Sequence, residues 1–298
     1  MSPELPDPII VVKRVGDVRI HTFVSTFTGD NIANATHIIE SKNTLVLVDG
    51  QVLAFYASKF RQYAQSLDKP IERLYLSHSH PDHWFGLGSA FRDGIDIYAL
   101  PETASFIQEH GEASREDHLE KLGDQAPPKE IVVPQNIVKL HDDTEESEET
   151  IDGVRYLFHK TTNTEIDFLL TIGLPDLGVY ITQDLIYCGT HLYLYVLPGK
   201  DRIPAGADLT KEMGHWIEVL GKLLKSDYEL FLAGHGFPAD KIEVARNIEY
   251  LSEAKYVIDS GMTKYDFKSH MLQRYPERKC PGIFDIYLPR LFDGATGY

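Results

Sequence analysis

The first half of the chain alternates between apolar runs and short polar turns, a pattern that favours strands. Residues 9–24 contain two such runs, divided at Gly16 and Asp17, and we expect a hairpin there. A second hairpin is predicted from residues 35–40 and 44–50, which a short polar turn joins. The run at 44–50 has an apolar centre at residues 45–48, which predicts a strand in the interior of a sheet.

Helical spacing replaces the alternation after Gly50. Apolar residues recur every three or four positions over residues 52–66, and residues 71–76 return to a strand pattern. This strand ends directly before a polar loop at residues 77–86. Beyond the loop, the pattern predicts a short helix at 86–91, a strand at 95–99 and a helix at 101–110. The charged residues 112–129 are expected to cover a site or the surface.

The second half follows a similar scheme. Strands are predicted at residues 154–160, 168–172 and 178–182, and amphipathic helices at 209–226, 242–258 and 264–275. Six acidic residues among positions 142–149 predict a solvated hairpin tip. A calcium loop is not indicated, because the regular spacing of oxygen ligands and the turn glycine are missing. The tail at 280–298 mixes apolar residues with proline and glycine.

Composition and charge narrow the classes of function. The 298 residues include 45 acidic and 29 basic side chains, a formal net charge of −16. A nucleic-acid partner is therefore not expected, because phosphate binding needs a basic face. Cys188 and Cys280 form no C-x-x-C pair and no disulfide framework. Lacking a signal-like N-terminus or a long apolar run, the chain is predicted to be one cytoplasmic domain over residues 1–298, with residues 238–298 packing on it.

The loop after the strand at 71–76 holds His78, His80, Asp82 and His83 within six residues. Imidazole and carboxylate groups suit a borderline divalent cation such as zinc. His78 and His80 are two positions apart in an extended segment, so both can face one ion. Asp82 and His83 follow the turn at Pro81 and can face a second ion. The alternative is a surface loop in which the histidines are accidental.

The segment His78-Ser79-His80-Pro81-Asp82-His83 resembles the H-x-H-x-D-H signature of the metallo-β-lactamase superfamily. The resemblance implies a hydrolase with an α/β fold of four layers, the αββα sandwich. It also implies a dinuclear site, in which His78 and His80 bind one metal ion and Asp82 and His83 bind the other. Asp82 is in addition predicted to be the catalytic residue.

Two later segments are similar to the same superfamily. Asp184 follows the apolar residues 178–182 and matches the aspartate that bridges the two ions. His235 lies between Gly234 and Gly236 after an apolar run, and matches the histidine that completes the second metal ion. For His235 the alternative is a turn histidine between glycines.

The third ligand of the first metal departs from the usual pattern. Residues 160–167 contain no histidine, where most members of the superfamily have a G-H-T-x-G element. Thr164-Glu165 instead resembles the alkylsulfatase branch, in which a glutamate replaces that histidine. Glu165 is therefore the first choice for this position, and Asp167 and His159 are the alternatives.

The predicted ligands imply a mechanism. Two cations that share Asp184 and a water molecule would lower the pKa of the water and produce a hydroxide nucleophile. We therefore expect a hydrolase of small esters, lactones, thioesters or alkyl sulfates. Two zinc ions are the predicted cofactors, and the added carboxylate also suits manganese or iron. The alternatives are an iron-dependent oxidoreductase of the same fold and a non-catalytic metal-binding relative. The predicted partner is a small molecule rather than nucleic acid or membrane, and the oligomeric state is left open.

Other residues keep two interpretations. Asp49 either supports the metal loop, as the resemblance implies, or caps the helix that follows it. Residues 192–198, together with Trp84 and Phe85, form either an apolar wall for the substrate or part of the core. His110 and His118 are expected to face solvent rather than to bind metal.

Overall fold

The computed structural model describes residues 5–128, 131–194 and 209–293. Its first sheet has seven strands, which lie side by side in the order of the chain. The first four pair antiparallel, and the remaining three continue parallel to the fourth. The strands are β1 (Ile9–Val15), β2 (Val18–Val24), β3 (Ala35–Glu40), β4 (Leu45–Val48), β5 (Ile71–Tyr75), β6 (Ile97–Ala99) and β7 (Asn136–Ile137). Both predicted hairpins are confirmed.

The second sheet has five strands in the order β12-β11-β10-β9-β8. Its pairs are antiparallel except for β11 and β12, which run parallel. The strands are β8 (Glu146–Ile151), β9 (Val154–Thr162), β10 (Phe168–Leu174), β11 (Val179–Cys188) and β12 (Leu230–Gly236). A 3₁₀ turn (Pro175–Leu177) joins β10 to β11.

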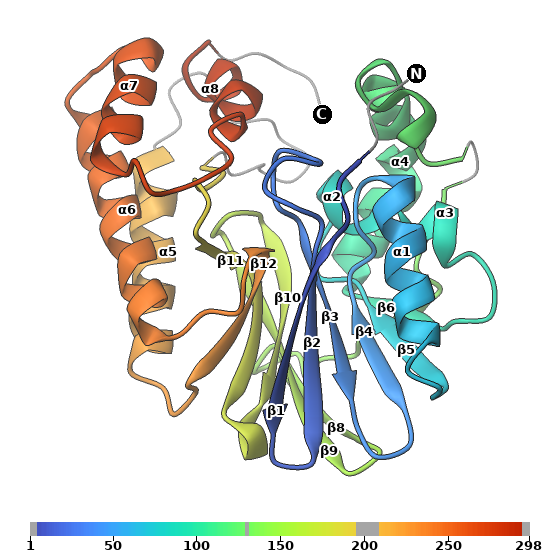
Figure 1. The fold of residues 1–298 in the computed structure, drawn as a ribbon. Helices are drawn as coiled ribbons and strands as arrows, with labels where there is room; N and C mark the ends of the chain where they lie inside the picture. The colour runs from blue at the N-terminus through green and yellow to red at the C-terminus, as the bar shows by residue number, and fades with distance from the viewer. Residues whose placement is uncertain (1–4, 129–130, 195–208, 294–298) are drawn as a thin grey trace.

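Helices cover the outer side of each sheet (Figure 1). On the side of the first sheet lie α1 (Ala54–Gln65), α2 (Pro81–Trp84), α3 (Leu87–Ala90) and α4 (Pro101–Leu122), which a 3₁₀ turn (Gly123–Gln125) follows. On the side of the second sheet lie α5 (Leu209–Leu224), α6 (Lys241–Asp259), α7 (Lys264–Arg274) and α8 (Ile283–Asp293). This order of helices, sheet, sheet and helices confirms the predicted αββα sandwich.

Strand β4 shows how the sequence divides the two faces of the first sheet. Leu45 and Leu47 belong to the apolar cluster shared with α1, whereas Val46 and Val48 belong to the cluster between the sheets. Successive side chains of a strand point to opposite faces. A strand that is covered on both faces must therefore be apolar throughout, as β4 is. The cluster between the sheets also includes Ile172, Ile181 and Leu232.

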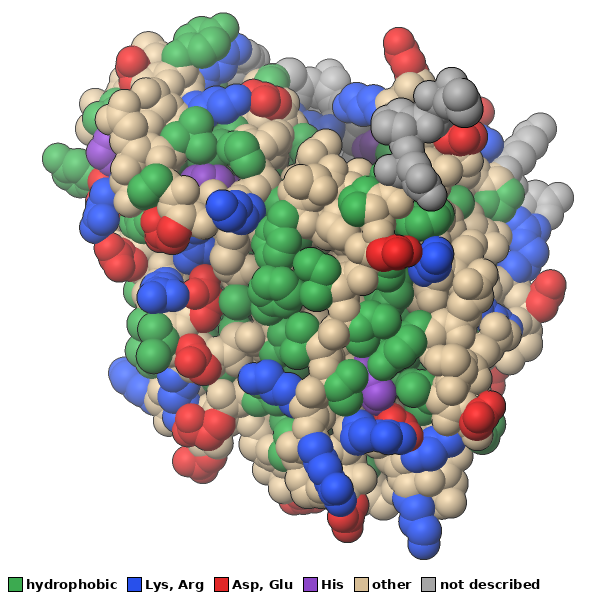
Figure 2. Space-filling view, viewed as in Figure 1, with side chains coloured by type: hydrophobic (Ala, Val, Ile, Leu, Met, Phe, Trp, Pro, Cys, Tyr) green, Lys and Arg blue, Asp and Glu red, His purple; other side chains and the backbone are tan. Residues whose placement is uncertain are grey.

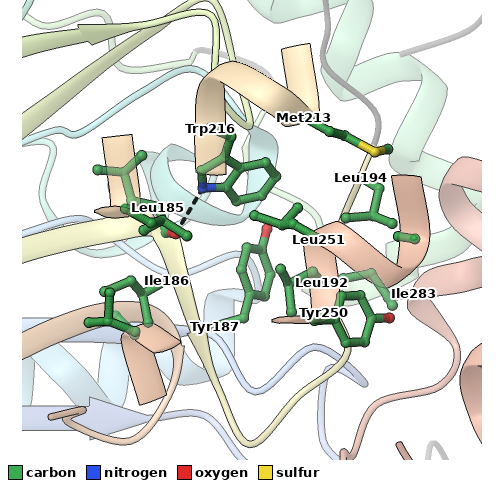
Figure 3. Close-up of a cluster of buried hydrophobic side chains, with 14 of the residues drawn as sticks. Leu185, Ile186, Tyr187, Leu192, Leu194, Met213, Trp216, Tyr250, Leu251 and Ile283 are labelled. Atoms are coloured by element: carbon green, nitrogen blue, oxygen red, sulfur yellow. Dashed lines mark hydrogen bonds between the residues drawn. The ribbon is translucent and has the colours of Figure 1, made fainter. Parts of the chain in front are cut away.

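The outer side of the second sheet packs on its helices through large side chains (Figure 3). Trp216 of α5 is fully buried, and its indole nitrogen donates to the backbone oxygen of Leu185 in β11 at 3.0 Å. Tyr250 and Leu251 of α6 and Ile283 of α8 belong to the same cluster. This layer holds β11, which carries Asp184, in place.

Four segments differ from the sequence-based expectation. The helix predicted at 101–110 continues to Leu122, because charged residues beyond position 111 form its exposed face. The acidic segment is a turn only up to Glu145, and its remaining residues begin the edge strand β8. Strand β11 continues past residue 182 to Cys188. The C-terminal tail forms helix α8.

The surface carries charges of both signs. Figure 2 shows acidic and basic side chains intermixed on one face of the molecule, with apolar side chains gathered near its centre. The exposed apolar residues of the protein include Ile9, Ile10 and Val12 of the edge strand β1. In the described part of the chain, no helix combines the length and the apolar character that crossing a bilayer requires.

Candidate metal centre

The candidate site lies where β5 ends. Beyond Tyr75 the chain leaves the sheet and turns at Pro81 into the short helix α2. Proline suits the first turn of a helix, because its missing N–H removes no helical hydrogen bond there. The indole nitrogen of Trp84 donates to the backbone oxygen of Ser79 at 2.9 Å and ties the helix to the preceding loop. The four predicted ligands flank this turn: His78, His80, Asp82 and His83.

All seven side chains predicted as ligands converge beside this loop. Their nitrogen and oxygen atoms form two groups, and within each group the atoms lie within 4.8 Å of one another. The first group is His78, His80, Glu165 and Asp184. The second group is Asp82, His83, Asp184 and His235. Asp184 belongs to both.

Asp184 stands between the two groups. Its Oδ2 lies 3.7 Å from His78 Nε2 and 3.2 Å from His235 Nε2. Its Oδ1 lies 3.3 Å from His83 Nε2. Asp82 Oδ2 closes the second group, at 3.3 Å from His83 Nε2 and 3.4 Å from His235 Nε2. Both oxygens of Asp184 thus face imidazole nitrogens, a placement suited to a carboxylate shared by two ions.

Glu165 is carried inward by the turn between β9 and β10. Asn163 adopts a φ of +52°, and its backbone N–H donates to the oxygen of Asp167 at 3.2 Å, which closes the turn. Glu165 at the tip is 1% exposed. Its Oε1 lies 3.0 Å from His80 Nδ1, and its Oε2 lies 3.9 Å from His78 Nε2. Glu165 therefore lies beside both histidines that are predicted to bind the first metal ion.

The two alternatives to Glu165 lie elsewhere. His159 is on β9, and its Nδ1 lies 3.0 Å from a carboxylate oxygen of Glu146 on the neighbouring strand β8. Neither His159 nor Asp167 belongs to either group of potential ligands found among the described residues. Of the three candidates, Glu165 alone belongs to a group of potential ligands in the described part of the chain, and its role as a ligand stays a prediction.

The sequence pattern predicted that Asp184 follows the end of a strand. In the structure Asp184 lies inside β11. The register of β11 with β12 shifts on both sides of Gln183, whose φ is +44°. Such an irregularity turns the next side chain away from its regular direction. The partner strand leaves space because Gly234 has no side chain: a Cβ there would meet Asp184 Oδ1 at 1.8 Å.

His235 is oriented by the loop between β2 and β3. Its Nδ1 lies 2.9 Å from the backbone oxygen of Ile32, which leaves Nε2 facing the site. Asp30 holds this loop by accepting hydrogen bonds from the N–H groups of Ile32 and Ala33 at 3.0 and 2.9 Å. Asn34 donates its side-chain amide to Asp82 Oδ2 at 3.3 Å. No sequence pattern marks Asp30 or Asn34, because such residues are frequent in any turn.

Asp49 lies beneath the metal loop and is fully buried. Its carboxylate accepts from the N–H and the hydroxyl of Ser77, each at 2.7 Å, and from Gln183 of the second sheet. The ring nitrogen Nδ1 of His83 lies 2.7 Å from the same carboxylate. Helix α1 begins after Leu53 with no side-chain cap. The capping interpretation of Asp49 is therefore wrong, and the supporting interpretation holds.

Tyr187 is a site residue that the sequence did not reveal. Its hydroxyl donates to Asp184 Oδ2 at 3.1 Å, and its ring stacks on His235 with centroids 4.7 Å apart. Residues three apart on a regular strand point to opposite faces. The irregular part of β11 spans both Asp184 and Tyr187, so their contact depends on a bulge that no sequence pattern predicts.

Burial and the surrounding charges act against each other in the site. Burial raises the pKa of Glu165 to about 7. Burial also opposes a charge on His235, but Asp184 and Asp82 outweigh it and raise the pKa of His235 to about 9. The pKa of His83 is likewise raised well above its ordinary value, because nearby carboxylates outweigh its burial. The second group therefore stabilises positive charge on two buried histidines, whereas burial lowers the pKa of His78 in the first group.

Several buried ligand atoms have no hydrogen-bond partner among the described residues. They are Nε2 of His78, His80 and His83, both carboxylate oxygens of Glu165, and Oδ1 of Asp184. One such atom costs about 1–3 kcal/mol, so a cluster of them needs an explanation. Bound divalent cations would satisfy these imidazole and carboxylate atoms. The donor set of both groups therefore fits metal ions.

The apolar residues near the site were predicted to form either a wall for the substrate or part of the core. Trp84 and Phe85 are fully buried in the core of the first sheet, and Leu192 and Leu194 in that of the second. Tyr193 is partly exposed and lies beside His80, with ring centroids 5.4 Å apart. Of the predicted wall, residues 195–198 lie outside the described residues.

Neither histidine of helix α4 belongs to the two groups. His110 is partly exposed. His118 does not simply face solvent, because its ring packs against Phe85 at 5.4 Å and its Nδ1 lies 2.7 Å from the backbone oxygen of Ser114.

Solved structures with a similar fold connect this chain to known proteins, although its sequence alone does not. No protein-family model matches the sequence, and no curated protein matches it in sequence. The metallo-β-lactamase FIM-1 from Pseudomonas aeruginosa, in a mono-zinc form, aligns with a TM-score of 0.59 and 14% identity over 85% of this chain and 98% of its own. A metallo-β-lactamase from Hirschia baltica aligns with a TM-score of 0.58 and 17% identity over 83% and 98%. The chain has the metallo-β-lactamase fold.

A second kind of metallo-β-lactamase-fold structure is also similar. A double mutant of the secondary alkylsulfatase PisA1 aligns with a TM-score of 0.60 and 17% identity over 95% of this chain and 50% of its own. The present chain thus spans about half of that structure. Both resemblances seen in the sequence are confirmed at the level of the fold.

Proposed function

We propose that this protein is a metal-dependent hydrolase that uses two divalent cations, with zinc as the first choice, on a small ester-like substrate. The observation that carries the proposal is the convergence of seven side chains into two groups that share Asp184, with buried and unpaired ligand atoms. The metallo-β-lactamase fold supports it, and the similar FIM-1 structure is a mono-zinc form. The net charge of −16 supports a small-molecule substrate over nucleic acid.

Each group of ligands would hold one cation. His78, His80, Glu165 and Asp184 are the proposed ligands of the first ion, and Asp82, His83, Asp184 and His235 are those of the second. Bound there, the cations would lower the pKa of water and stabilise the negative charge that develops on a carbonyl oxygen during ester hydrolysis.

The protein's own groups fix the direction of the ligand atoms. Asp49 lies against Nδ1 of His83 and the oxygen of Ile32 against Nδ1 of His235, so Nε2 of each ring is directed into the site. Such contacts select one tautomer of the neutral imidazole. The geometry of the second group therefore does not depend on the cation alone.

Asp82 is the proposed catalytic residue. Its side chain is 18% exposed, compared with 0% for Glu165 and 1% for Asp184, so it lies at the open side of the centre. Burial opposes its ionisation, but His83 and His235 outweigh burial and hold its pKa below the ordinary value. An ionised carboxylate at the open side is placed to take the proton that the attacking water loses.

The carboxylate of Glu165 supports a second candidate function for the protein. A carboxylate in place of an imidazole makes the first group richer in oxygen, which suits manganese or iron as well as zinc. An iron-dependent oxidoreductase is therefore the alternative to a zinc hydrolase.

Metal analysis together with a substrate panel tests the proposal. We expect about two equivalents of zinc per chain, and turnover of at least one p-nitrophenyl ester, lactone, thioester or alkyl sulfate that a chelator abolishes. Asp184→Asn should lower kcat/KM by more than about 100-fold, because losing even an outer partner of a ligand costs 10–100-fold. Asp259→Asn, an exposed surface change on α6, is the control.

Other outcomes contradict the proposal. A single iron with oxygen consumption would favour the oxidoreductase. Full metal content without turnover of any substrate in the panel would favour a non-catalytic metal-binding protein.

A further inference from the structure

A cluster of aromatic and basic side chains lies beside the first metal group. The ring of Tyr193 meets the ring of His80 edge-on, with centroids 5.4 Å apart. Tyr287 of α8 packs against Tyr193 with centroids 5.5 Å apart. One turn further along α8, Arg290 Nη1 donates to the hydroxyl of Tyr193 at 3.2 Å. Residues three apart share one side of a helix, so this side of α8 faces the metal centre across Tyr193.

Arg290 has no carboxylate partner in the part of the chain that the structure describes, although it is partly buried. Several other arginines pair with acidic side chains, among them Arg19, Arg73, Arg155, Arg246, Arg274 and Arg278. Arg61 instead packs over the ring of Phe91. Acidic residues outnumber basic ones by 45 to 29, so partners are abundant. A partly buried guanidinium without a counter-ion leaves donors ready for an anion.

Two further observations describe the surroundings of Arg290. The hydroxyl of Tyr287 is buried and has no hydrogen-bond partner among the described residues. Burial, and to a smaller extent the charges of Lys121 and Arg290, lower the pKa of His118, which packs on Phe85. The charge of Arg290 thus lies close enough to His118 of α4 to affect it, and its guanidinium contacts Tyr193.

We propose that Arg290, together with Tyr193, forms a subsite that binds a carboxylate group of the substrate, with the buried Tyr287 packed behind Tyr193. This carboxylate is not the reacting group, because a whole tyrosine side chain separates Arg290 from His80. The subsite rests on the proposed hydrolase function and refines it. The substrate class is an ester whose acyl part ends in a carboxylate, with a short apolar spacer that packs on the ring of Tyr193.

A pair of matched esters tests the subsite. p-Nitrophenyl hydrogen glutarate and p-nitrophenyl valerate have acyl chains of the same length and differ in the terminal carboxylate. We expect the metal-loaded protein to prefer the charged ester. Arg290→Met should lower the ratio of the two kcat/KM values about 10- to 100-fold, the size of a charge-assisted hydrogen bond. Arg290→Lys should keep part of the preference, because the ammonium retains the charge.

The control is Arg14→Met, an exposed arginine at the turn between β1 and β2, which should leave the ratio unchanged. The ratio corrects for partial loss of folded protein, since both esters are measured on the same sample. An Arg290→Met variant with the wild-type ratio overturns the subsite while leaving the hydrolase proposal intact.

Ligand binding separates the two proposals if neither ester is hydrolysed. In that case calorimetry with phenylacetate and 2-phenylethanol replaces the rate measurement. Tighter binding of phenylacetate that Arg290→Met abolishes supports the subsite even though the hydrolase proposal has failed for these esters. Equal binding of phenylacetate to the wild type and to Arg290→Met, or no binding to either, overturns the subsite.

Discussion

Two buried polar clusters lie at opposite ends of the first sheet, and they are completed in different ways. At the end remote from the metal centre, Glu40 pairs with Arg19, with Lys69 at 2.8 Å and with His21 at 2.9 Å. The other nitrogen of His21 lies 2.7 Å from the hydroxyl of Tyr63. The Glu40 cluster, these five residues, thus supplies its own positive charges.

The candidate metal centre contains the same kinds of acidic and imidazole side chains but no such compensation by lysine or arginine. In the described parts of the chain, no lysine or arginine pairs with a carboxylate of either group of ligands. Several of its inward atoms have no hydrogen-bond partner among the described residues, whereas the ring nitrogens of His21 both have partners. The comparison teaches that the chain itself supplies the opposite charge for the Glu40 cluster, whereas the second cluster leaves ligand atoms available for a cation.

Among the changes that test this comparison, the largest loss of zinc affinity is expected on substitution of Asp49. Asp49→Asn places an amide nitrogen where the carboxylate meets Ser77, His83 and Gln183, so at least one of these donors loses its acceptor. We expect the affinity for zinc to fall about 10- to 100-fold, as is usual when the partner of a ligand histidine is lost. Competition with a chromophoric chelator measures it.

The matched control is Asp152→Asn. Asp152 is also bonded by several donors, among them Ser41 and Asn43, at the other end of the sheet. Its substitution should leave the zinc affinity unchanged. An Asp49 variant that binds zinc as tightly as the wild type would show that the metal loop does not need this support.

The sequence predicted those parts of the molecule that local patterns determine. The all-apolar run of β4 predicted an interior strand, and the spacing of His78, His80, Asp82 and His83 predicted two adjacent groups of ligands. The contacts made by Asn34 and Tyr187 were not predictable, because they join segments that only the folded chain brings together. The register shifts in β11 likewise come from the pairing of whole strands.

The contribution of Glu40 to the free energy of unfolding should depend on pH, whereas the neutral side chain of Glu40→Gln cannot titrate. Burial alone would raise the pKa of Glu40, but its hydrogen bonds from Arg19, Lys69 and His21 outweigh burial and lower the pKa to about 2. Glu40→Gln should therefore lower the free energy of unfolding at pH 7 by about 2–3 kcal/mol. Urea denaturation followed by circular dichroism measures the difference.

The sign of the pH dependence follows from the lowered pKa. The extra stability of the wild type over Glu40→Gln should be complete above about pH 5 and should shrink as the pH falls towards 2. Hydrolytic activity at pH 7 should not change in samples that remain folded, because the cluster lies at the end of β3 remote from the ligands. A difference in stability that is constant from pH 7 to pH 3 would contradict the assigned pKa.

The smallest effect is expected at Asn34, where the loop between β2 and β3 reaches Asp82. Asn34→Ala removes the amide that donates to Asp82 Oδ2 at 3.3 Å but keeps the backbone contacts of residue 34 with Ser25 and His235. One hydrogen bond to a charged group is worth about 1.5–3 kcal/mol, and this long one should be at the lower end, a loss of about tenfold in affinity. The loss should be confined to one of the two ions, because Asp82 belongs to the second group alone.

Zinc titration of the apoprotein should then resolve one weakened step and one unchanged step. The control Asn43→Ala, at the turn between β3 and β4, should change neither step. Equal weakening of both steps would mean that the loop supports the centre as a whole rather than the second ion through Asp82.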